Sequence, residues 1–253
     1  MLIATWNVNS IKARHEHLGA WLDRRRPDVV CLQELKSIEA KLPVELFTSR
    51  GYQLEALGQP TYNGVAIASL RPITDVERGL PEGDEGQARV ISGVIDGVRV
   101  VCAYCPQGSE VESPKFAYKL RFFDALIPHI AARLANGPLI LAGDINIAPL
   151  PDDVWDDVEM KDQVSYHPLE HERFRALEGL GLIDVVKPRL APRTYTFWDY
   201  RELSFRRKRG MRIDHLLVTA DVAARVTGAG VDIEERKKEK PSDHAPVWLT
   251  LGE

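Results

Sequence analysis

Polar side chains stand where apolar, strand-like runs of this sequence begin or end, and they are the residues best suited to chemistry. They are Asn7, Glu34, Asp144, Asn146, Asp214, Asp243 and His244. Each one alone has an ordinary explanation, because Asn and Asp are common at turns and caps, where their side chains bond nearby backbone. Together they form an oxygen-rich set with a single histidine.

An oxygen-rich set of this kind suits a hard divalent cation. Mg²⁺ is usually held by few carboxylates, with waters and substrate phosphate oxygens completing its shell. A zinc site would need more His or Cys. The residue types therefore favour metal-assisted hydrolysis of a phosphate ester.

The elements that must position these residues alternate between strands and helices. Apolar runs predict strands over 2–8, 29–32, 64–69, 90–95, 98–105, 138–143, 213–218 and 245–251. Amphipathic spacing predicts helices over 13–23, 115–134 and 169–180. This mixed order, without an internal repeat or a linker, indicates an α/β or α+β domain.

Length and composition are those of a globular protein. The 253 residues are 44% hydrophobic and 28% charged, which excludes a disordered or fibrous chain. No apolar run approaches the roughly 18–20 residues that span a bilayer, and the N-terminus lacks the pattern of a signal peptide. We therefore expect a cytoplasmic protein with no membrane partner.

Three cysteines argue against a disulfide framework. Cys102 and Cys105 have the C-x-x-C spacing of redox and zinc sites, but they lie in a run that predicts a strand. Residues three apart on a strand point to opposite faces. We expect neither a redox nor a zinc function for this pair.

The net charge of −4, from 33 basic and 37 acidic residues, gives no overall reason to expect a nucleic-acid partner. The distribution is more informative, because the basic residues form two clusters. The first comprises Arg201, Arg206, Arg207, Lys208, Arg209 and Arg212, and the second comprises Arg236, Lys237, Lys238 and Lys240. From charge alone, such clusters could equally bind a polyanion or form solvated loops.

The motifs around these residues match a known family. They are Trp-Asn-Val-Asn at 6–9, Leu-Gln-Glu at 32–34, Tyr-Cys-Pro-Gln-Gly at 104–108, Gly-Asp-Ile-Asn at 143–146, Tyr-Thr-Phe-Trp-Asp-Tyr-Arg at 195–201, Arg-Ile-Asp at 212–214 and Ser-Asp-His at 242–244. In this order the sequence resembles the exonuclease III family of apurinic/apyrimidinic endonucleases, within the wider endonuclease/exonuclease/phosphatase superfamily. The motifs at 195–201 and 212–214 are the more specific to the DNA-repair branch.

The resemblance implies an α/β fold, a four-layer sandwich of two mixed β-sheets flanked by helices. It implies a single catalytic domain over 1–253, because both ends of the chain contribute to one site. The implied activity is Mg²⁺-dependent hydrolysis of the phosphodiester 5′ to abasic sites in double-stranded DNA, as in base excision repair. A 3′→5′ exonuclease and 3′-end cleaning are expected with it, Mn²⁺ is an alternative cofactor, and we expect a monomer.

The same resemblance implies roles for the ligand and phosphate-binding residues. Glu34 resembles the principal metal ligand, with Asn7 beside it and Asp243 as a further contributor. Tyr104 and Asn146 resemble hydrogen-bond donors to the phosphate oxygens, which stabilise charge in the transition state.

Three residues remain for proton transfer. His244 would face the scissile phosphate, and Asp214 would hold its ring. Whether His244 acts as a base or as a charged phosphate clamp is not decided by sequence. Asp144 is the other candidate for activating water or protonating the leaving oxygen.

Substrate contacts are implied as well. Phe197, Met211 and Ile213 would form an apolar pocket for a flipped-out sugar that lacks its base; as aromatic residues, Phe197 and Trp198 could also be ordinary core. Further substrate contacts are expected from Trp198, Arg201, Gln107 and Lys115. Two runs within the basic clusters flank the site motifs in sequence: Arg201 with Arg206–Arg209, and Lys237, Lys238 and Lys240. Phosphate positioning therefore becomes their favoured role, and Lys119 is expected to add to it.

Two other functions remain open. A phosphatase or phospholipid diesterase would share the motifs around Glu34, Asp144 and His244, but the Phe197–Arg201 stretch favours DNA. A non-catalytic nucleic-acid-binding protein should have a broken site, whereas this sequence keeps every expected residue.

Overall fold

Two six-stranded sheets carry the architecture of the computed structural model, which describes residues 1–252. The first sheet has the order β11-β12-β1-β2-β4-β3, and the second has the order β5-β6-β7-β8-β10-β9. The strands are β1 (Leu2–Asn7), β2 (Val29–Gln33), β3 (Gln53–Leu57), β4 (Val65–Ser69), β5 (Thr74–Arg78), β6 (Val90–Ile95), β7 (Val98–Tyr104), β8 (Leu139–Asp144), β9 (Ile183–Asp184), β10 (Asp214–Val218), β11 (Val226–Val231) and β12 (Val247–Leu251). Each sheet is mixed, because β1 pairs parallel with β2 and β7 pairs parallel with β8 while the other pairs are antiparallel.

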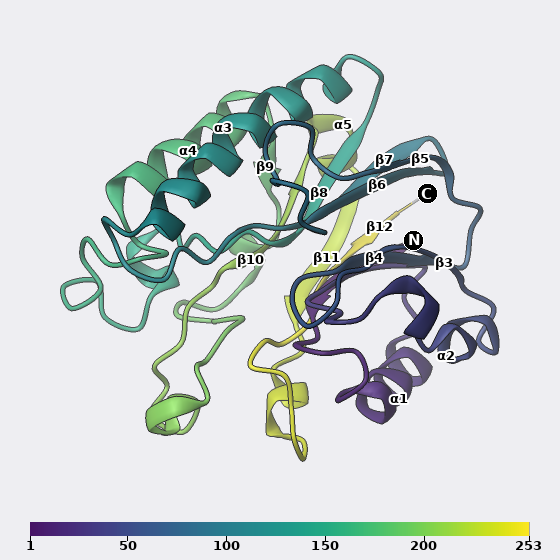
Figure 1. Ribbon diagram of the computed structural model, residues 1–253, viewed down its shortest axis with the longest axis horizontal. Coiled ribbons are helices and arrows are strands. Elements are labelled where there is room, and N and C mark those ends of the chain that lie inside the picture. Colours follow the sequence, from purple (N-terminus) through teal and green to yellow (C-terminus); the bar gives the residue numbers. More distant parts are fainter. Residues whose placement is uncertain (253) are drawn as a thin grey trace.

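Helices cover the outer faces of both sheets (Figure 1). The helices are α1 (His15–Arg25), α2 (Val44–Thr48), α3 (Pro114–Leu134), α4 (Pro168–Gly179) and α5 (Ala220–Ala223), with short 3₁₀ turns at Glu39–Lys41, Pro151–Asp153, Lys187–Arg189, Arg201–Leu203 and Ile233–Lys237. In the view of Figure 1, α1 and α2 lie outside the first sheet and α3 and α4 outside the second. The four-layer sandwich predicted from the resemblance is confirmed.

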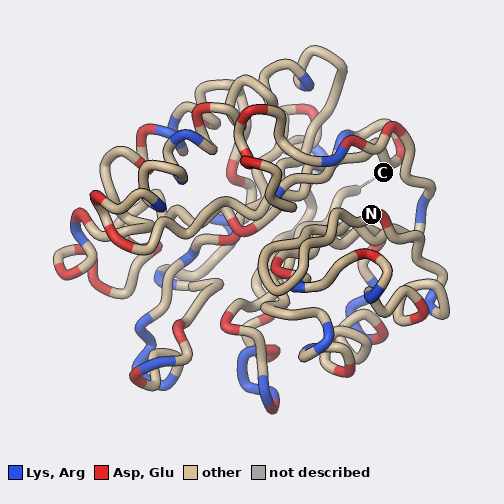
Figure 2. The backbone as a smooth tube through the Cα atoms, viewed as in Figure 1, with Lys and Arg blue, Asp and Glu red and all other residues tan. Residues whose placement is uncertain are grey.

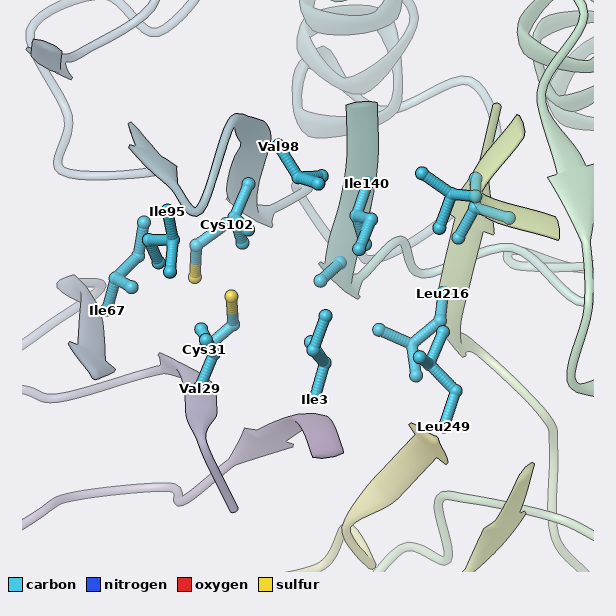
Figure 3. Packing of buried hydrophobic residues seen from close by; sticks show 14 of the residues in the cluster. Ile3, Val29, Cys31, Ile67, Ile95, Val98, Cys102, Ile140, Leu216 and Leu249 are labelled. Carbon is cyan, nitrogen blue, oxygen red and sulfur yellow. The ribbon is translucent and has the colours of Figure 1, made fainter. Parts of the chain in front are cut away.

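Alternation along the strands divides the core into three layers. On β1, Ile3 faces the second sheet, whereas Ala4 and Trp6 pack under α1. On β8, Ile140 and Ala142 face the first sheet, and their neighbours pack under α3 and α4. Figure 3 shows the middle layer, where residues from the two sheets meet. Burial of both faces explains why these strands read as continuous apolar runs.

The cysteines follow the same alternation. Cys102 lies in the layer between the sheets, where its sulfur faces that of Cys31 (Figure 3), and Cys105 lies in the layer under α3. All three thiols are free and buried. The prediction that Cys102 and Cys105 diverge is confirmed.

The strands and helices predicted from apolar patterns are confirmed to within a few residues, while β3, β5, β9, β11, α2 and α5 escaped prediction. The missed strands lie at or near sheet edges: β5 is mostly exposed, and β11 has the Gly-rich sequence Val-Thr-Gly-Ala-Gly-Val. Half-exposed edge strands have a weak apolar pattern. None of the helices in residues 1–252 combines the length and the apolar character needed to cross a bilayer.

Candidate active site

The predicted site residues meet because strand direction and side-chain alternation place them at one end of the sandwich. Asn7 ends β1 and Asp144 ends β8, while Asp214 begins β10, which runs antiparallel to β8 and pairs Asp214 with Asp144. His244 precedes β12, which runs antiparallel to β1. Since Ile3 and Ile140 face the opposite sheet, residues an even number of positions further on face it too, and Asn7 and Asp144 therefore meet in the middle layer.

A close approach of two strands fixes Asp144. Gly143 has φ +154°, and a Cβ at this position would lie 1.9 Å from the Ala103 carbonyl oxygen. Only glycine fits there. The glycine lets β8 stay close to β7, so that Tyr104 lies beside Asp144 in register.

Asn7 joins the two carboxylates. Its Nδ2 donates to Oε1 of Glu34 and to Oδ2 of Asp144, both at 2.9 Å. Its Oδ1 accepts from the backbone N–H of Asn9 at 3.0 Å, which fixes the orientation of the amide. Asn7 therefore turns N–H groups, not its oxygen, toward the carboxylates.

His244 and Asp214 form a buried pair. Nδ1 of His244 lies 2.8 Å from Oδ2 of Asp214, and Nε2 lies 3.7 Å from Oδ2 of Asp144. The ring of Phe197 packs against the imidazole with centroids 4.9 Å apart. One ring nitrogen is thus anchored while the other faces Asp144.

Electrostatics couple these groups. Burial alone would lower the pKa of His244, but the charges of Asp214 and Asp144 outweigh it and raise the pKa to about 10. Burial raises the pKa of Asp144 to about 8, with the negative charges of Asp214 and Glu34 adding to the effect against the attraction of His244. Such perturbation of neighbouring buried groups is typical of functional sites.

Glu34 and Tyr104 form the next pair. The Tyr104 hydroxyl donates to Oε1 of Glu34 at 2.9 Å. Burial raises the pKa of Tyr104, and the charges of Glu34 and Asp144 raise it further, so the hydroxyl stays a donor. Burial alone would raise the pKa of Glu34, but hydrogen bonds from Asn7 and Lys36 outweigh it and the pKa is lowered.

Two side chains near Glu34 escaped the sequence analysis as site members. Lys36 pairs with Oε2 of Glu34 at 2.8 Å and also donates to Oδ1 of Asn9. Asn9 in turn donates to Oδ1 of Asp243 at 2.9 Å. The sequence did hold one indication of them, because Lys36 and Asn9 each stand two residues after a predicted site residue. Both lie beyond the end of their strand, however, where alternation no longer predicts the direction of a side chain.

The donor set suits a metal ion. One ligand atom each from Glu34, Asp144 and His244 lie within 4.8 Å of one another. Burial is the main cause of the raised pKa of Asp144, to which the charge of the partly buried Glu34 adds a smaller part, and a divalent cation would stabilise both carboxylates in their charged form. Asn146 lies beside this group, 4% exposed, and its Nδ2 donates to the Cys105 carbonyl at 3.0 Å.

The predicted apolar pocket residues gather next to His244. Phe197, Met211 and Ile213 pack in one cluster and are joined by residues that the sequence analysis did not select. These are Ala148, Val154, Met160 and Tyr166. Trp198 is 4% exposed and packs instead with Tyr195 and Ala245 in a separate cluster, as an ordinary core aromatic does.

In the structure, some residues of the two basic clusters are exposed and others are buried. Exposed cations lie in two loops that extend side by side in Figure 2, where both loops carry blue segments. They are Arg201, Arg206, Arg207 and Lys208 in one loop and Lys237, Lys238 and Lys240 in the other. Lys115 and Gln107 are exposed as well.

Three cations expected at the surface are buried, and for them the prediction was wrong. Arg212 is 1% exposed and pairs with Asp153 and Asp184. Arg236 is 7% exposed and donates to the Trp198 carbonyl. Lys119 is fully buried and pairs with Glu170, which is fully buried too. Carboxylate partners compensate Arg212 and Lys119 for the lost hydration. Arg236 has instead a carbonyl and the rings of two aromatic residues around its guanidinium.

Comparisons with known proteins agree on a single family. The model of the Endonuclease/Exonuclease/phosphatase family matches residues 4–244. The chain is 31% identical to the exodeoxyribonuclease III of Haemophilus influenzae, with 98% of each protein covered, and 26% identical to an exodeoxyribonuclease of Bacillus subtilis, with 100% of each covered.

Solved structures give the same result. A variant of the 3′ phosphatase NExo from Neisseria, bound to a product DNA hairpin, matches with a TM-score of 0.97 and 40% identity. The same protein from Neisseria meningitidis is described as a 3′–5′ exonuclease. An AP endonuclease from Archaeoglobus fulgidus matches with a TM-score of 0.94 and 34% identity, and each comparison covers 100% of both chains.

Proposed function

The chain belongs to the endonuclease/exonuclease/phosphatase family, and on that premise we propose that it incises DNA 5′ to abasic sites and trims 3′ ends. The chain is a DNA-hydrolysing nuclease of the exodeoxyribonuclease III type. Its proposed substrate is double-stranded DNA with abasic sites or 3′ ends, and its proposed role is base excision repair. We further propose that it acts in the cytoplasm as a monomer with one catalytic domain.

One observation carries this proposal. Glu34, Asp144 and His244 converge within 4.8 Å, and Asp214 holds the imidazole at 2.8 Å. These groups come from both sheets and from both ends of the chain. A cluster of two carboxylates and an oriented imidazole suits hydrolysis of a phosphodiester with a divalent cation.

Mg²⁺ is the proposed cation, with Mn²⁺ as an alternative. Glu34 would hold it, with Asp243 close by and Asn7 orienting the Glu34 carboxylate through its amide N–H. When bound, such an ion neutralises the phosphate oxygens and the charge that develops on the leaving 3′ oxygen.

The residues of the chain itself have distinct proposed tasks. Asn146 would donate a hydrogen bond to the phosphate oxygens, and so would Tyr104 once its hydroxyl turns from Glu34 to the substrate. His244 would face the phosphate with Nε2 while Asp214 fixes its ring. Asp144 and His244 are the two groups that can exchange a proton with the attacking water or with the leaving oxygen.

The apolar cluster supports the proposed selectivity. Phe197 touches His244, and Met211 and Ile213 extend the apolar surface away from it. A sugar without a base would fit against such a surface, whereas a nucleotide with its base would not. Exposed cations of the two loops, with Lys115, Arg201 and Gln107, would hold the flanking DNA.

The test is a duplex with one tetrahydrofuran abasic analogue, incubated with Mg²⁺ or with chelator. Two control duplexes run alongside: one is intact with a free 3′ hydroxyl, and the other ends in a 3′ phosphate. The analogue cannot undergo β-elimination, so a metal-dependent cut on its 5′ side must be hydrolytic. We expect this cut, together with shortening from the 3′ end and release of phosphate.

Other outcomes would change the assignment. Trimming or 3′-phosphate release without abasic incision would keep the nuclease but remove the abasic role of Phe197, Met211 and Ile213. Absence of cleavage on all three duplexes would favour a phosphatase acting on another ester or a non-catalytic DNA-binding protein.

A further inference from the structure

Lys119 lies in the second turn of α3, fully buried, and its ammonium group contacts three oxygen atoms. Nζ donates to the Asn146 carbonyl at 2.7 Å and to the Gln107 carbonyl at 3.2 Å, and it pairs with Oε1 of Glu170. The ammonium thus contacts three separate segments, two through hydrogen bonds and one through an ion pair. Without exposure, Lys119 cannot reach DNA.

Glu170 is equally committed. It lies in the first turn of α4, where Oε2 accepts from the backbone N–H of His167 at 3.0 Å and caps the helix. Its other oxygen neutralises Lys119. One carboxylate thus ties the start of α4 to the second turn of α3, and only an acid can do both.

The Asn146 carbonyl is the contact that matters for the site. Asn146 has φ 57°, a left-handed conformation that costs free energy for a residue with a side chain. Four hydrogen bonds hold it there. Lys119 donates to its carbonyl, its N–H donates to Asp144 Oδ1 at 3.1 Å and to the Ile213 carbonyl at 3.2 Å, and its Nδ2 donates to the Cys105 carbonyl. Removal of the ammonium would free the carbonyl, and the backbone could relax.

Gln107 provides the second backbone carbonyl that accepts from Lys119. Its carbonyl accepts from Lys119, while its chain continues from Tyr104 and Cys105, which lie against Glu34 and Asn146 respectively. The loops that follow β7 and β8 are therefore fixed to one ammonium at the point where both enter the site.

We propose that Lys119 and Glu170 are positioning residues, which set the Asn146 side chain for the scissile phosphate without touching the substrate. The inference rests on the proposed function and deepens it. A buried ion pair is a poor source of stability, because replacing it with apolar residues is often neutral or stabilising. Retention of the pair under the site is better explained by the backbone geometry that it imposes.

The experiment compares Lys119→Met with Arg121→Met, which replaces an exposed cation two residues later on the same helix, where it pairs with Glu85. Single-turnover cleavage of the abasic duplex and DNA affinity are measured well below the melting temperature of each variant. We expect Lys119→Met to lower kcat roughly 10²-fold, the effect of a misplacement of about 1 Å, with DNA affinity little changed. Arg121→Met should leave both kcat and DNA affinity unchanged.

A double-variant cycle separates positioning from general destabilisation. In an Asn146→Ala background, Lys119→Met should lower kcat by less than about 3-fold, because the group that it positions is gone. An additive loss in the double variant, or a wild-type kcat for Lys119→Met, would overturn the inference. If Lys119→Met does not fold, Glu170→Gln is used, since it keeps the cap on His167 but leaves Lys119 unpaired.

A second readout keeps the inference distinct from the proposed function. The side-chain amide resonances of Asn146, identified by their loss in Asn146→Asp, should shift in Glu170→Gln. If wild type cleaves no DNA, the proposed function fails, and these resonances still decide the positioning claim. Unshifted resonances would reject it.

Discussion

The Asn7 amide bridges the two sheets at the site by donating to Asp144 across the middle layer at 2.9 Å, while a second hydrogen bond of 2.9 Å reaches Glu34. Asn7 ends a strand of the first sheet and Asp144 ends a strand of the second. The separation of the two carboxylates is thus set by one neutral side chain that both sheets hold in place. A carboxylate at this position would add repulsion where an amide adds two donors.

Asn7→Ala tests the importance of that bridge. Loss of both hydrogen bonds should let the Glu34 and Asp144 carboxylates move apart, and we expect metal affinity and turnover to fall by roughly 10- to 100-fold, as for other residues that orient metal ligands. Single-turnover cleavage as a function of Mg²⁺ concentration measures both quantities. An unchanged half-saturating Mg²⁺ concentration would show that Asn7 does not organise the metal site.

Asp144→Asn addresses the chemical step. The substitution keeps the size of the side chain but removes the group that can take or give a proton, so turnover should collapse by roughly 10³-fold or more. DNA affinity should survive, because the exposed cations that would hold the backbone are untouched. Anisotropy titration and single-turnover cleavage give the two quantities, and near-normal turnover would assign proton transfer elsewhere, with His244 as the remaining candidate.

The sequence predicted the site well where the alternation of side chains along a strand applies. Asn7, Asp144 and Asp214 lie at strand ends whose buried runs are long enough to fix which face each side chain takes. The resemblance supplied the fact that these strands belong to facing sheets, which apolar patterns cannot show. Lys36 and Asn9 were not predicted as site residues because side chains in loops do not alternate between two faces.

Prediction failed where a charge was assumed to be solvated. Lys119 stands on α3 in a position that a helical pattern assigns to the apolar face, yet its charge favoured a surface role until Glu170, 51 residues away, was found beside it. Arg212 shows the same effect with Asp153 and Asp184. Long-range partners decide the burial of a charge, and one sequence does not reveal them.

Salt dependence of DNA binding tests the two cationic loops. Neutralising Lys237, Lys238 and Lys240 together to Gln should reduce the slope of log K against log salt by about 2–3, since each phosphate contact contributes about 0.9. Arg71→Gln with Arg225→Gln is the control. Arg71 follows β4 and Arg225 precedes β11, both at the end of the sandwich away from the site. Equal slopes for wild type and the triple variant would place the DNA elsewhere.

The buried cluster around Arg212 predicts how stability depends on pH. Burial alone would raise the pKa of Asp153, but hydrogen bonds from Arg212 and Lys187 outweigh it and hold the pKa below its usual value. The unfolded chain therefore binds a proton at a higher pH than the folded chain does. The stabilisation is complete above the unfolded pKa of about 4 and is lost as the pH falls through the folded pKa.

Asp153→Asn removes this charge while leaving Arg212 buried beside Asp184. We expect a loss of about 3 kcal/mol in the free energy of unfolding at pH 7, the cost of disrupting a buried ion pair. The difference between wild type and variant should narrow as the pH is lowered from 5 to 3, because the unfolded wild-type chain then takes up a proton at Asp153 that the folded chain does not bind. Urea unfolding at each pH measures it, with the half-exposed Asp96→Asn as control, expected within about 0.5 kcal/mol of wild type. A difference that stays constant over this range would mean that Asp153 acts through packing and not through its charge.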